Sequence, residues 1–320
     1  MFKGIYVKPV KDFFYLTETL NLYYPYLLNF VIINNCKEEV MAKEIIFDQP
    51  ELKDPPKIIF SDIDGTLLNS YHSLSDRTRL ALKEASLKFP IIFSSGRNPQ
   101  ALISMHQVLL KKAPLISLNG ALILDENFKP LFQQPIQAQY IAKFLNDFLN
   151  IECDCAINFY TASNWYTNNP NYFGQIHEEK IVGFPAKVMP LPFPIEEEPI
   201  LKIMIIAGSL DIPKIYEYLK ENYPFLKIVR SRNDLIELYD LNTSKGTALE
   251  KIVNFYGFNT SEALAIGDSP LDYPLLEKAG YKAAVNNAYY ELRELANIHL
   301  PNNDEDGAAL LLEYYTKQVQ

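Results

Sequence analysis

Short apolar runs alternate with amphipathic stretches from Lys57 to the end of the chain. The apolar runs have the length of buried β-strands, and turn residues bound them. The predicted strands cover residues 57–61, 90–95, 115–118, 263–266, 283–285 and 298–300. The predicted helices between them cover residues 76–88, 99–111, 247–256, 271–278, 289–296 and 305–315. This alternation predicts an α/β fold with a doubly wound, mainly parallel sheet that helices cover on both faces.

The pattern changes in the middle of the chain. A hairpin-like alternation at 121–132 precedes a predicted helix at 139–149 and aromatic-rich strands at 156–161 and 165–167. After a proline-rich stretch come predicted strands at 200–207, 227–231 and 235–239 and a helix at 212–221. This order predicts an inserted α+β cap domain within a discontinuous core. We expect the core at 57–121 and 242–320, the cap at 122–241, and hinges near 121–124 and 239–243.

The first 56 residues form a predicted N-terminal extension. Its apolar stretch at 20–33 contains Asn21, Pro25 and Asn29 and is shorter than the roughly 18 apolar residues of a membrane span. It also lacks the features of a signal peptide. The purine-rich codons of Lys-Glu-Glu just before Met41 are typical of a ribosome-binding site. Two interpretations stay open: residues 1–40 are not part of the native protein, or they pack on its surface.

Composition describes an ordinary soluble globular protein. The chain has 320 residues, of which 48% are hydrophobic and 22% charged. A net charge of -9 without a basic stripe argues against nucleic acid as a partner. The three cysteines and four histidines lack the spacing of metal ligands or a redox pair. We therefore expect reduced thiols in a cytoplasmic protein that binds no membrane.

Candidate catalytic residues follow the predicted strands. Asp62 and Asp64 come directly after the strand at 57–61, and Ser95, Gly96 and Arg97 end the strand at 90–95. Asp268 follows the strand at 263–266, and Lys245 lies just ahead of the predicted helix at 247–256. Because the carboxyl ends of parallel strands meet at one edge of a sheet, we expect these side chains to converge there.

This set of residues suits the hydrolysis of a phosphate monoester. Such an ester is a dianion, so a carboxylate can attack its phosphorus only when a cation and fixed donors offset the repulsion. Asp62 is the predicted nucleophile, and Asp64 the predicted general acid and base. We expect Mg²⁺ to contact the Asp62 carboxylate, the Asp64 carbonyl and Asp268. Lys245 and Ser95 would bind the phosphoryl oxygens.

The ordered motifs resemble those of the haloacid dehalogenase superfamily, and within it the Cof-type phosphatases of subfamily IIB. The residues at the family's motif positions are Asp62, Asp64, Ser95, Lys245, Asp268 and Asp272. Two further segments agree, Asn119-Gly120-Ala121 and Asn303-Asp304-Glu305-Asp306-Gly307. The resemblance covers about residues 57–320. It implies a Rossmann-like core with a cap of the C2 type.

The resemblance also implies a site and a substrate class. The implied metal ligands are Asp62, Asp64, Asp268 and Asp272, and the implied substrate-binding residues are Gly96, Arg97, Asn119 and Gly120. The implied activity is Mg²⁺-dependent hydrolysis of a small phosphorylated metabolite through an aspartyl-phosphate. A sugar phosphate and a phosphorylated cofactor both stay open as substrates. A cytoplasmic monomer or weak homodimer is expected.

Two positions depart from the family pattern. Leu271 stands where the fourth motif usually has Asn, and Asn286 stands where another segment usually has Gly. Because that Asn typically supports the metal site, we expect Leu271 to weaken or alter metal binding. Two alternatives stay open. A phosphoryl transferase or mutase of the same superfamily could use the same aspartyl-phosphate, and Leu271 suggests a catalytically weakened protein that only binds a phosphorylated ligand.

Overall fold

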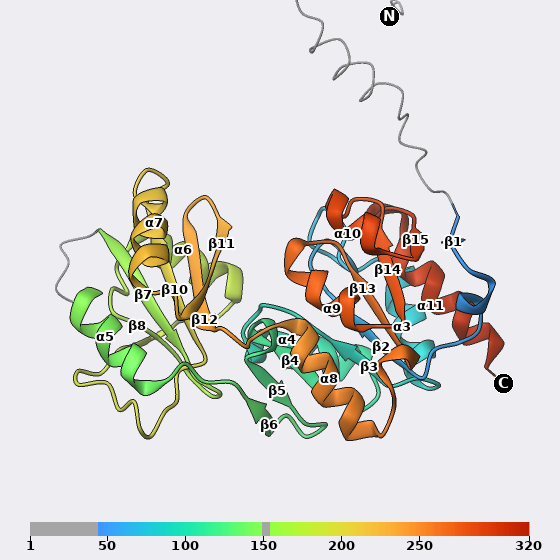
Figure 1. Cartoon of the computed structure of the whole chain (residues 1–320), viewed down its shortest axis with the longest axis horizontal. Helices are drawn as coiled ribbons and strands as arrows, with labels where there is room; N and C mark the ends of the chain where they lie inside the picture. The colour runs from blue at the N-terminus through green and yellow to red at the C-terminus, as the bar shows by residue number, and fades with distance from the viewer. Residues whose placement is uncertain (1–43, 149–153, 320) are drawn as a thin grey trace, which may run out of the picture. The chain divides into compact units, whose positions relative to one another are not determined.

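A computed structural model of the chain describes residues 44–148 and 154–319. The predictions for residues 1–40 and for Met41 lie outside the described residues. The strands of the described residues form three sheets, and Figure 1 labels the strands. Among the described residues, no helix is long and apolar enough to cross a membrane.

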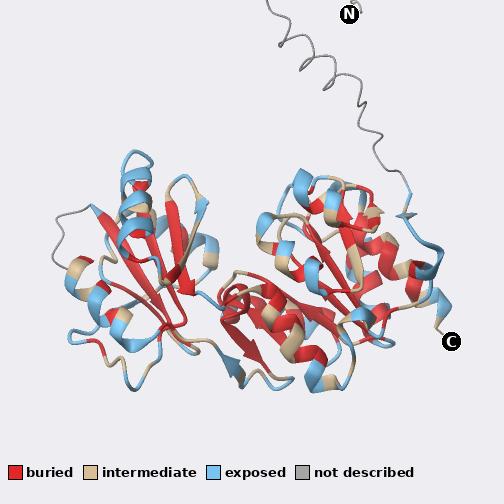
Figure 2. Cartoon of the chain, in the orientation of Figure 1, coloured by how far each residue is buried: buried red, intermediate tan, exposed pale blue. Residues whose placement is uncertain are grey.

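The first sheet has six strands and carries the predicted α/β core. Its order is β1 (Ile46–Phe47), β15 (Ile298–Leu300), β14 (Tyr281–Val285), β13 (Ala263–Gly267), β2 (Ile58–Ser61) and β3 (Ile91–Phe93). All neighbouring pairs are parallel except β1 with β15. Every residue of β2, β3 and β13 is buried (Figure 2), as expected for strands with helices on both faces.

Six helices flank this sheet, close to the predicted positions. They are α3 (Asp76–Ser86), α4 (Pro99–Leu109), α8 (Lys245–Tyr256), α9 (Tyr273–Lys278), α10 (Tyr290–Leu295) and α11 (Gly307–Gln318). Side-chain caps fix three starts, because Ser75, Asn98 and Ser244 accept hydrogen bonds from backbone N–H groups of the first turn. The helix expected at 271–278 begins instead as a 3₁₀ turn, Pro270–Asp272, before α9.

A three-stranded sheet follows β3 along the chain. It consists of β4 (Leu115–Ser117), β5 (Leu122–Leu124) and β6 (Pro130–Gln133), all antiparallel. The predicted strand at 115–118 thus pairs with a hairpin, and one parallel bridge between Ser94 and Ile116 links it to the strand-end of β3. The expected hinge at 121–124 falls largely in β5, which is buried and paired on both sides, and the hinge stays a prediction.

The segment of residues 138–240, here called the insert, has its own sheet. Its strands are β7 (Cys155–Tyr160), β8 (Trp165–Thr167), β9 (Lys187–Val188), β10 (Lys202–Ala207), β11 (Leu226–Arg232) and β12 (Leu235–Asp240). Its helices are α5 (Ala138–Phe148), α6 (Phe173–Val182) and α7 (Ile212–Asn222). The order β11-β12-β10-β7-β8-β9 is antiparallel apart from the pair β8 and β9. The predicted domain boundaries stay predictions.

Alternation gives the sheet of the insert two different faces. Ile157, Ile203, Ile205 and Ile236 belong to an apolar cluster that also contains buried residues of α5 and α7. The residues next to them in the strands, such as Lys202, point to the opposite face because successive side chains of a strand alternate. That opposite face contributes to the candidate site.

Candidate active site

The predicted catalytic residues lie at the carboxyl ends of adjacent strands. β2 is between β13 and β3 in the first sheet, so the segments after these three strands are neighbours. The backbone N–H of Asp62 donates to the Ile266 carbonyl at 2.9 Å, which sets the loop after β2 beside the loop that carries Asp268. The sequence-based expectation that these segments meet at one edge agrees with this register.

The loop after β2 is held by a tight approach to Asp268. Gly65 has a φ of +84°, and a Cβ there would lie 2.4 Å from an Asp268 carboxylate oxygen. Thr66 donates its hydroxyl to Asp268 Oδ1 at 2.8 Å. Only glycine allows both the left-handed conformation and the close approach.

Asn287 and Asn303 support the same loop. Asn287 donates through Nδ2 to the Gly65 carbonyl at 2.7 Å and accepts from the Asn303 N–H at 3.0 Å. Asn303 in turn donates through Nδ2 to the Leu68 carbonyl at 2.8 Å. These asparagines therefore position the backbone on either side of Thr66 and do not face the cavity.

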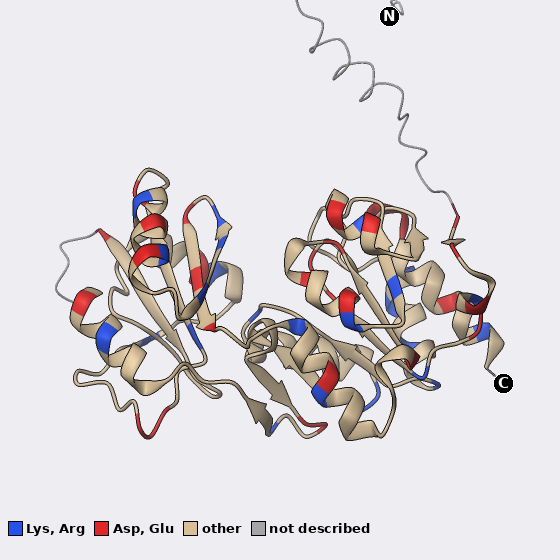
Figure 3. Cartoon of the chain, viewed as in Figure 1, with Lys and Arg blue, Asp and Glu red and all other residues tan. Residues whose placement is uncertain are grey.

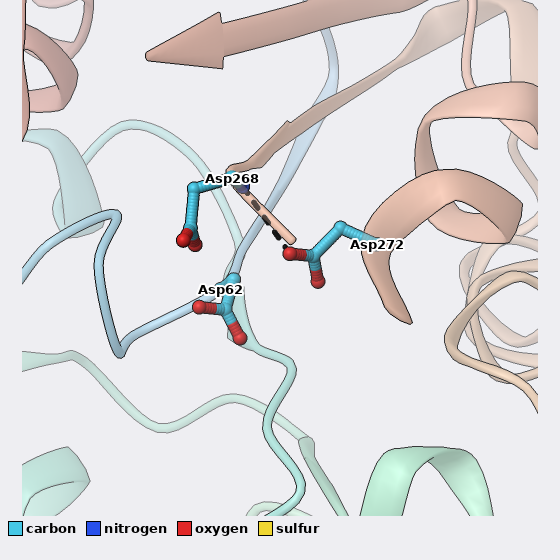
Figure 4. A group of neighbouring side chains, drawn as sticks. All are labelled: Asp62, Asp268 and Asp272. Carbon is cyan, nitrogen blue, oxygen red and sulfur yellow. Dashed lines mark hydrogen bonds between the residues drawn. The ribbon is translucent and has the colours of Figure 1, made fainter. Parts of the chain in front are cut away.

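Three carboxylates converge at the strand ends (Figure 4). One oxygen from each of Asp62, Asp268 and Asp272 lies within 4.8 Å of the others. Asp62 is 5% exposed and Asp272 is fully buried. Such a concentration of negative charge away from water requires nearby cations.

Lys245 is the protein cation in this cluster. Its Nζ donates to Asp62 Oδ1 and to Asp272 Oδ1, each at 2.5 Å. The other oxygen of Asp272 accepts from the backbone N–H groups of Asp268 and Ser269 and from the Ser269 hydroxyl. Both carboxylate oxygens of Asp272 thus accept hydrogen bonds from within the chain. The contacts of Asp272 therefore orient Lys245 and the loop after β13.

The pKa directions show that one lysine does not balance the cluster. Burial raises the pKa of Asp62 well above its usual value, although Lys245 opposes the rise. Burial and the charge of Asp272 raise the pKa of Asp268 to about 6. Burial alone would lower the pKa of Lys245, but its two carboxylate partners raise it above the usual value. Oxygen donors with excess negative charge are a set that fits a hard divalent cation.

Asp64 lies outside this carboxylate cluster. Arg97 donates to both of its carboxylate oxygens, with Nε at 2.8 Å from Oδ2 and Nη2 at 2.5 Å from Oδ1. The pair is partly exposed, at 35% for the Arg97 side chain and 41% for that of Asp64. In this arrangement the Asp64 side chain is oriented by arginine, so a metal contact from this residue would come from its backbone carbonyl.

The remaining predicted residues differ in their placement. Ser95, Gly96, Arg97 and Asn119 line a cavity of about 330 Å³, together with Asp62, Asp64 and Lys245. Gly120 is not among the lining residues. It has a φ of +99°, and a Cβ there would lie 2.2 Å from the Ser244 carbonyl. Gly120 therefore allows the turn after β4 to approach the start of α8, which carries Lys245.

Sequence reasoning missed the part of the cavity that the insert supplies. The lining residues from the insert are Tyr160, Glu178, Ile181, Val182, Lys202, Met204, Ser231, Arg232, Leu235 and Glu237. A signal was present, because Lys202 begins an otherwise apolar strand and Glu237 lies between apolar neighbours in β12. Leu271, the departure in the fourth motif, also lines the cavity.

Comparisons with known proteins agree with this geometry. The sequence profile of the haloacid dehalogenase-like hydrolases matches residues 59–312. A Haemophilus influenzae protein named as a candidate phosphatase is 32% identical over 262 residues, which cover 80% of this chain and 97% of that protein. A Bacillus subtilis protein named 5-amino-6-(5-phospho-D-ribitylamino)uracil phosphatase is 28% identical over 288 residues, covering 80% of this chain and 97% of that protein.

Solved structures show the same fold. A Thermotoga maritima protein has a TM-score of 0.72 and 23% identity, with 81% of this chain and 97% of that chain covered. A haloacid dehalogenase-like hydrolase from Bacteroides thetaiotaomicron has a TM-score of 0.71 and 21% identity, with 81% and 98% covered.

Proposed function

The chain belongs to the haloacid dehalogenase-like hydrolases and is a phosphatase, and we propose that it hydrolyses a small phosphate monoester with Mg²⁺. The observation that carries the proposal is the contact of Lys245 with Asp62 inside a cluster of three carboxylates. Lys245 directs one Asp62 oxygen, and the other remains available for attack. Asp62, Asp268 and the Asp64 carbonyl would hold the ion, which supplies positive charge to the phosphoryl oxygens.

The proposed reaction has two displacements. In the first, an Asp62 oxygen forms a bond to phosphorus while the bond from phosphorus to the ester oxygen breaks, and Asp64 gives that oxygen a proton. In the second, water attacks the phosphorus of the aspartyl-phosphate, Asp64 takes the proton from the water, and the bond to Asp62 breaks. The products are the alcohol and inorganic phosphate, and Asp62 is regenerated.

Arg97 has a defined part in this scheme. Because it donates to both Asp64 oxygens, one of these hydrogen bonds must open before Asp64 can reach the leaving oxygen. The remaining bond would keep the carboxyl group oriented toward the cavity. Arg97 is therefore proposed as a positioning residue for the general acid, and Ser95 as a donor to the phosphoryl group.

The substrate is proposed to be a sugar phosphate or a phosphorylated cofactor. A cavity of about 330 Å³ has room for a small metabolite. The Bacillus subtilis relative is named for a substrate whose phosphate lies on a ribityl chain, which is a polyol. The predicted cytoplasmic location and the monomer or weak homodimer stay predictions.

Replacement of Asp62 tests the nucleophile. Asp62→Asn keeps the size of the side chain, so we expect loss of phosphatase activity with a folded protein. Release of phosphate from p-nitrophenyl phosphate with Mg²⁺ is the assay, and circular dichroism checks the fold. Asp54→Asn is the matched control, because Asp54 is exposed and lies outside the cavity. Unchanged turnover by Asp62→Asn contradicts the assignment.

Leu271 favours one alternative, a protein that binds a phosphorylated ligand without hydrolysing it. Its apolar side chain lines the cavity where the family pattern has an amide. The absence of hydrolysis with Mg²⁺, together with binding of a sugar phosphate, would support that alternative. Faster transfer of phosphate to a sugar acceptor than to water would support a transferase or mutase.

A further inference from the structure

The insert supplies one wall of the cavity, and this wall includes the face of its sheet that lies opposite the apolar cluster. Lys202 and Met204 of β10, and Leu235 and Glu237 of β12, line the cavity. Their alternate neighbours pack in the apolar cluster with α5 and α7. β7 has no charged residue, Lys202 is the one charged residue of β10, and Glu237 lies within β12 (Figure 3).

Lys202 and Glu237 form a buried ion pair. Lys202 Nζ donates to Glu237 Oε1 at 2.5 Å, and the two side chains are 5% and 9% exposed. The Ser231 hydroxyl donates to Glu237 Oε2 at 2.6 Å. Burial would raise the pKa of Glu237, but Lys202 outweighs it and holds that pKa below the usual value. Both partners are therefore charged, and each neutralises the other.

Arg232 is neutralised in the same way. Its Nη2 lies 2.8 Å from Glu178 Oε2 on α6, and its Nε lies 3.0 Å from Asp234 Oδ1. Among the lining residues, the insert thus contributes two cations, Lys202 and Arg232, and two carboxylates, Glu178 and Glu237. The charges of these four lining residues sum to zero.

A neutral wall has a direct consequence for the leaving group. A second phosphate or a carboxylate on the substrate would lose its hydration on entering the cavity. It would gain no free cation in return, because Lys202 and Arg232 are already paired with carboxylates of the protein. A hydroxyl group carries no such penalty, and it can bond to the Ser231 oxygen or to a spare N–H of Lys202. Tyr160, Met204 and Leu235 offer apolar surface to the carbon chain.

We propose that the wall formed by Lys202, Glu237, Arg232 and Glu178 selects a hydroxyl-bearing leaving group without a second negative charge. This inference rests on the proposed function, because it names the class of phosphate monoester that the site accepts. Four residues that the sequence motifs do not include thereby determine specificity. Their paired charges exclude substrates that carry a second anionic group besides the phosphate, while Ser231 and Lys202 contact the hydroxyl groups of the substrate.

The test compares two substrates that differ in one group. Sorbitol 6-phosphate and 6-phosphogluconate have the same carbon chain, but one ends in a hydroxymethyl group and the other in a carboxylate. We expect kcat/KM to be at least about tenfold higher for sorbitol 6-phosphate. Hexyl phosphate, which lacks hydroxyls, should also be at least about tenfold poorer. Equal or faster turnover of 6-phosphogluconate overturns the charge selection, and equal turnover of hexyl phosphate overturns the contact with hydroxyls.

Glu178→Gln tests the mechanism of selection. Removing this carboxylate leaves Arg232 paired with Asp234 alone and releases its Nη2 toward the cavity, so the preference for sorbitol 6-phosphate should fall several-fold. Glu217→Gln is the matched control, because it makes the same charge change at an exposed position of α7. An equal change in both variants would mean that net charge acts at long range, which contradicts the proposal.

Calorimetry separates this inference from the proposed function. Binding of the two ligands to Asp62→Asn should differ by at least about tenfold in Kd, and this readout does not depend on hydrolysis. If the wild type is inactive toward p-nitrophenyl phosphate but the Kd values of the two ligands still differ as expected, the proposed function is contradicted and the inference about the wall stands. Equal affinities, or no binding of either ligand, overturn the inference.

Discussion

His106 should make the stability of the protein sensitive to acid. It lies on α4, is 1% exposed, and makes edge contacts with the rings of Phe93 and Phe128. Its Nε2 has no hydrogen-bond partner among the described residues. Burial lowers the pKa of His106 from 6.5 to about 4, because the imidazolium loses its water. The folded protein therefore keeps this side chain neutral.

The sign and size of the effect follow from this pKa. Between the two values the unfolded chain binds a proton that the folded protein does not, so the free energy of unfolding falls as the pH falls. The gap from 6.5 to about 4 corresponds to about 3 kcal/mol, at about 1.36 kcal/mol per pH unit. Going from about pH 7.5 to about pH 4.5 should remove about 2.5 kcal/mol through this one group.

The assay is urea unfolding of the wild type and of His106→Leu at both pH values. The variant cannot titrate here, so its unfolding free energy relative to the wild type should rise by about 2.5 kcal/mol at the lower pH. Contributions from the carboxyl groups and from the other histidines cancel in the difference between the wild type and the variant. His177→Leu is the control, because it makes the same substitution at an exposed position. A difference for His106→Leu that does not change with pH refutes the reasoning.

Three further predictions concern the site. Arg97→Gln should lower kcat roughly tenfold, because Asp64 loses both hydrogen bonds that orient it. Arg77→Gln breaks a similar pair with Glu313 away from the cavity and should leave kcat unchanged. Equal losses of kcat in the two variants would refute the positioning role of Arg97. Leu271→Asn should tighten the apparent Mg²⁺ affinity up to roughly tenfold in a metal titration of activity, and an unchanged affinity would contradict our interpretation of Leu271. Gly120→Ala should lower the unfolding free energy by about 2–4 kcal/mol, because strain at positive φ adds to the clash with Ser244. Gly257→Ala, with positive φ but nothing within 4 Å, should lose only about 1 kcal/mol in the same thermal or urea unfolding, and similar losses would disprove the clash.

The local pattern of the chain was enough to predict most of its elements. Strands β2, β13 and β14 are short apolar runs, and α3 and α8 begin at residues that cap their own first turns. Among the described α-helices and strands, β1, β9 and α6 escaped prediction. The two residues of β1 form a strand only by pairing with β15 far along the chain, and α6 exposes Phe173, Ile176 and Ile181 and so lacks a clear apolar stripe.

The candidate site divides in the same way. The sequence by itself determined which side chains follow the strands, because a parallel sheet brings all its carboxyl ends to one edge. Asp62, Ser95 and Asp268 could therefore be selected from their neighbours along the chain, and Lys245 from its place in the ordered motifs. The family followed from the order of these motifs.

Only the tertiary structure decided which groups contact one another. It placed Arg97 on Asp64, bonded both Asp272 oxygens, and gave Gly120 a packing role beside Ser244. It also brought the paired charges of the insert to the cavity. These contacts join residues far apart in sequence, and their geometry depends on strand register and on packing between elements. A local pattern carries neither, so the sequence determined the chemistry at the strand ends, whereas the fold decided the charge balance of the opposite wall.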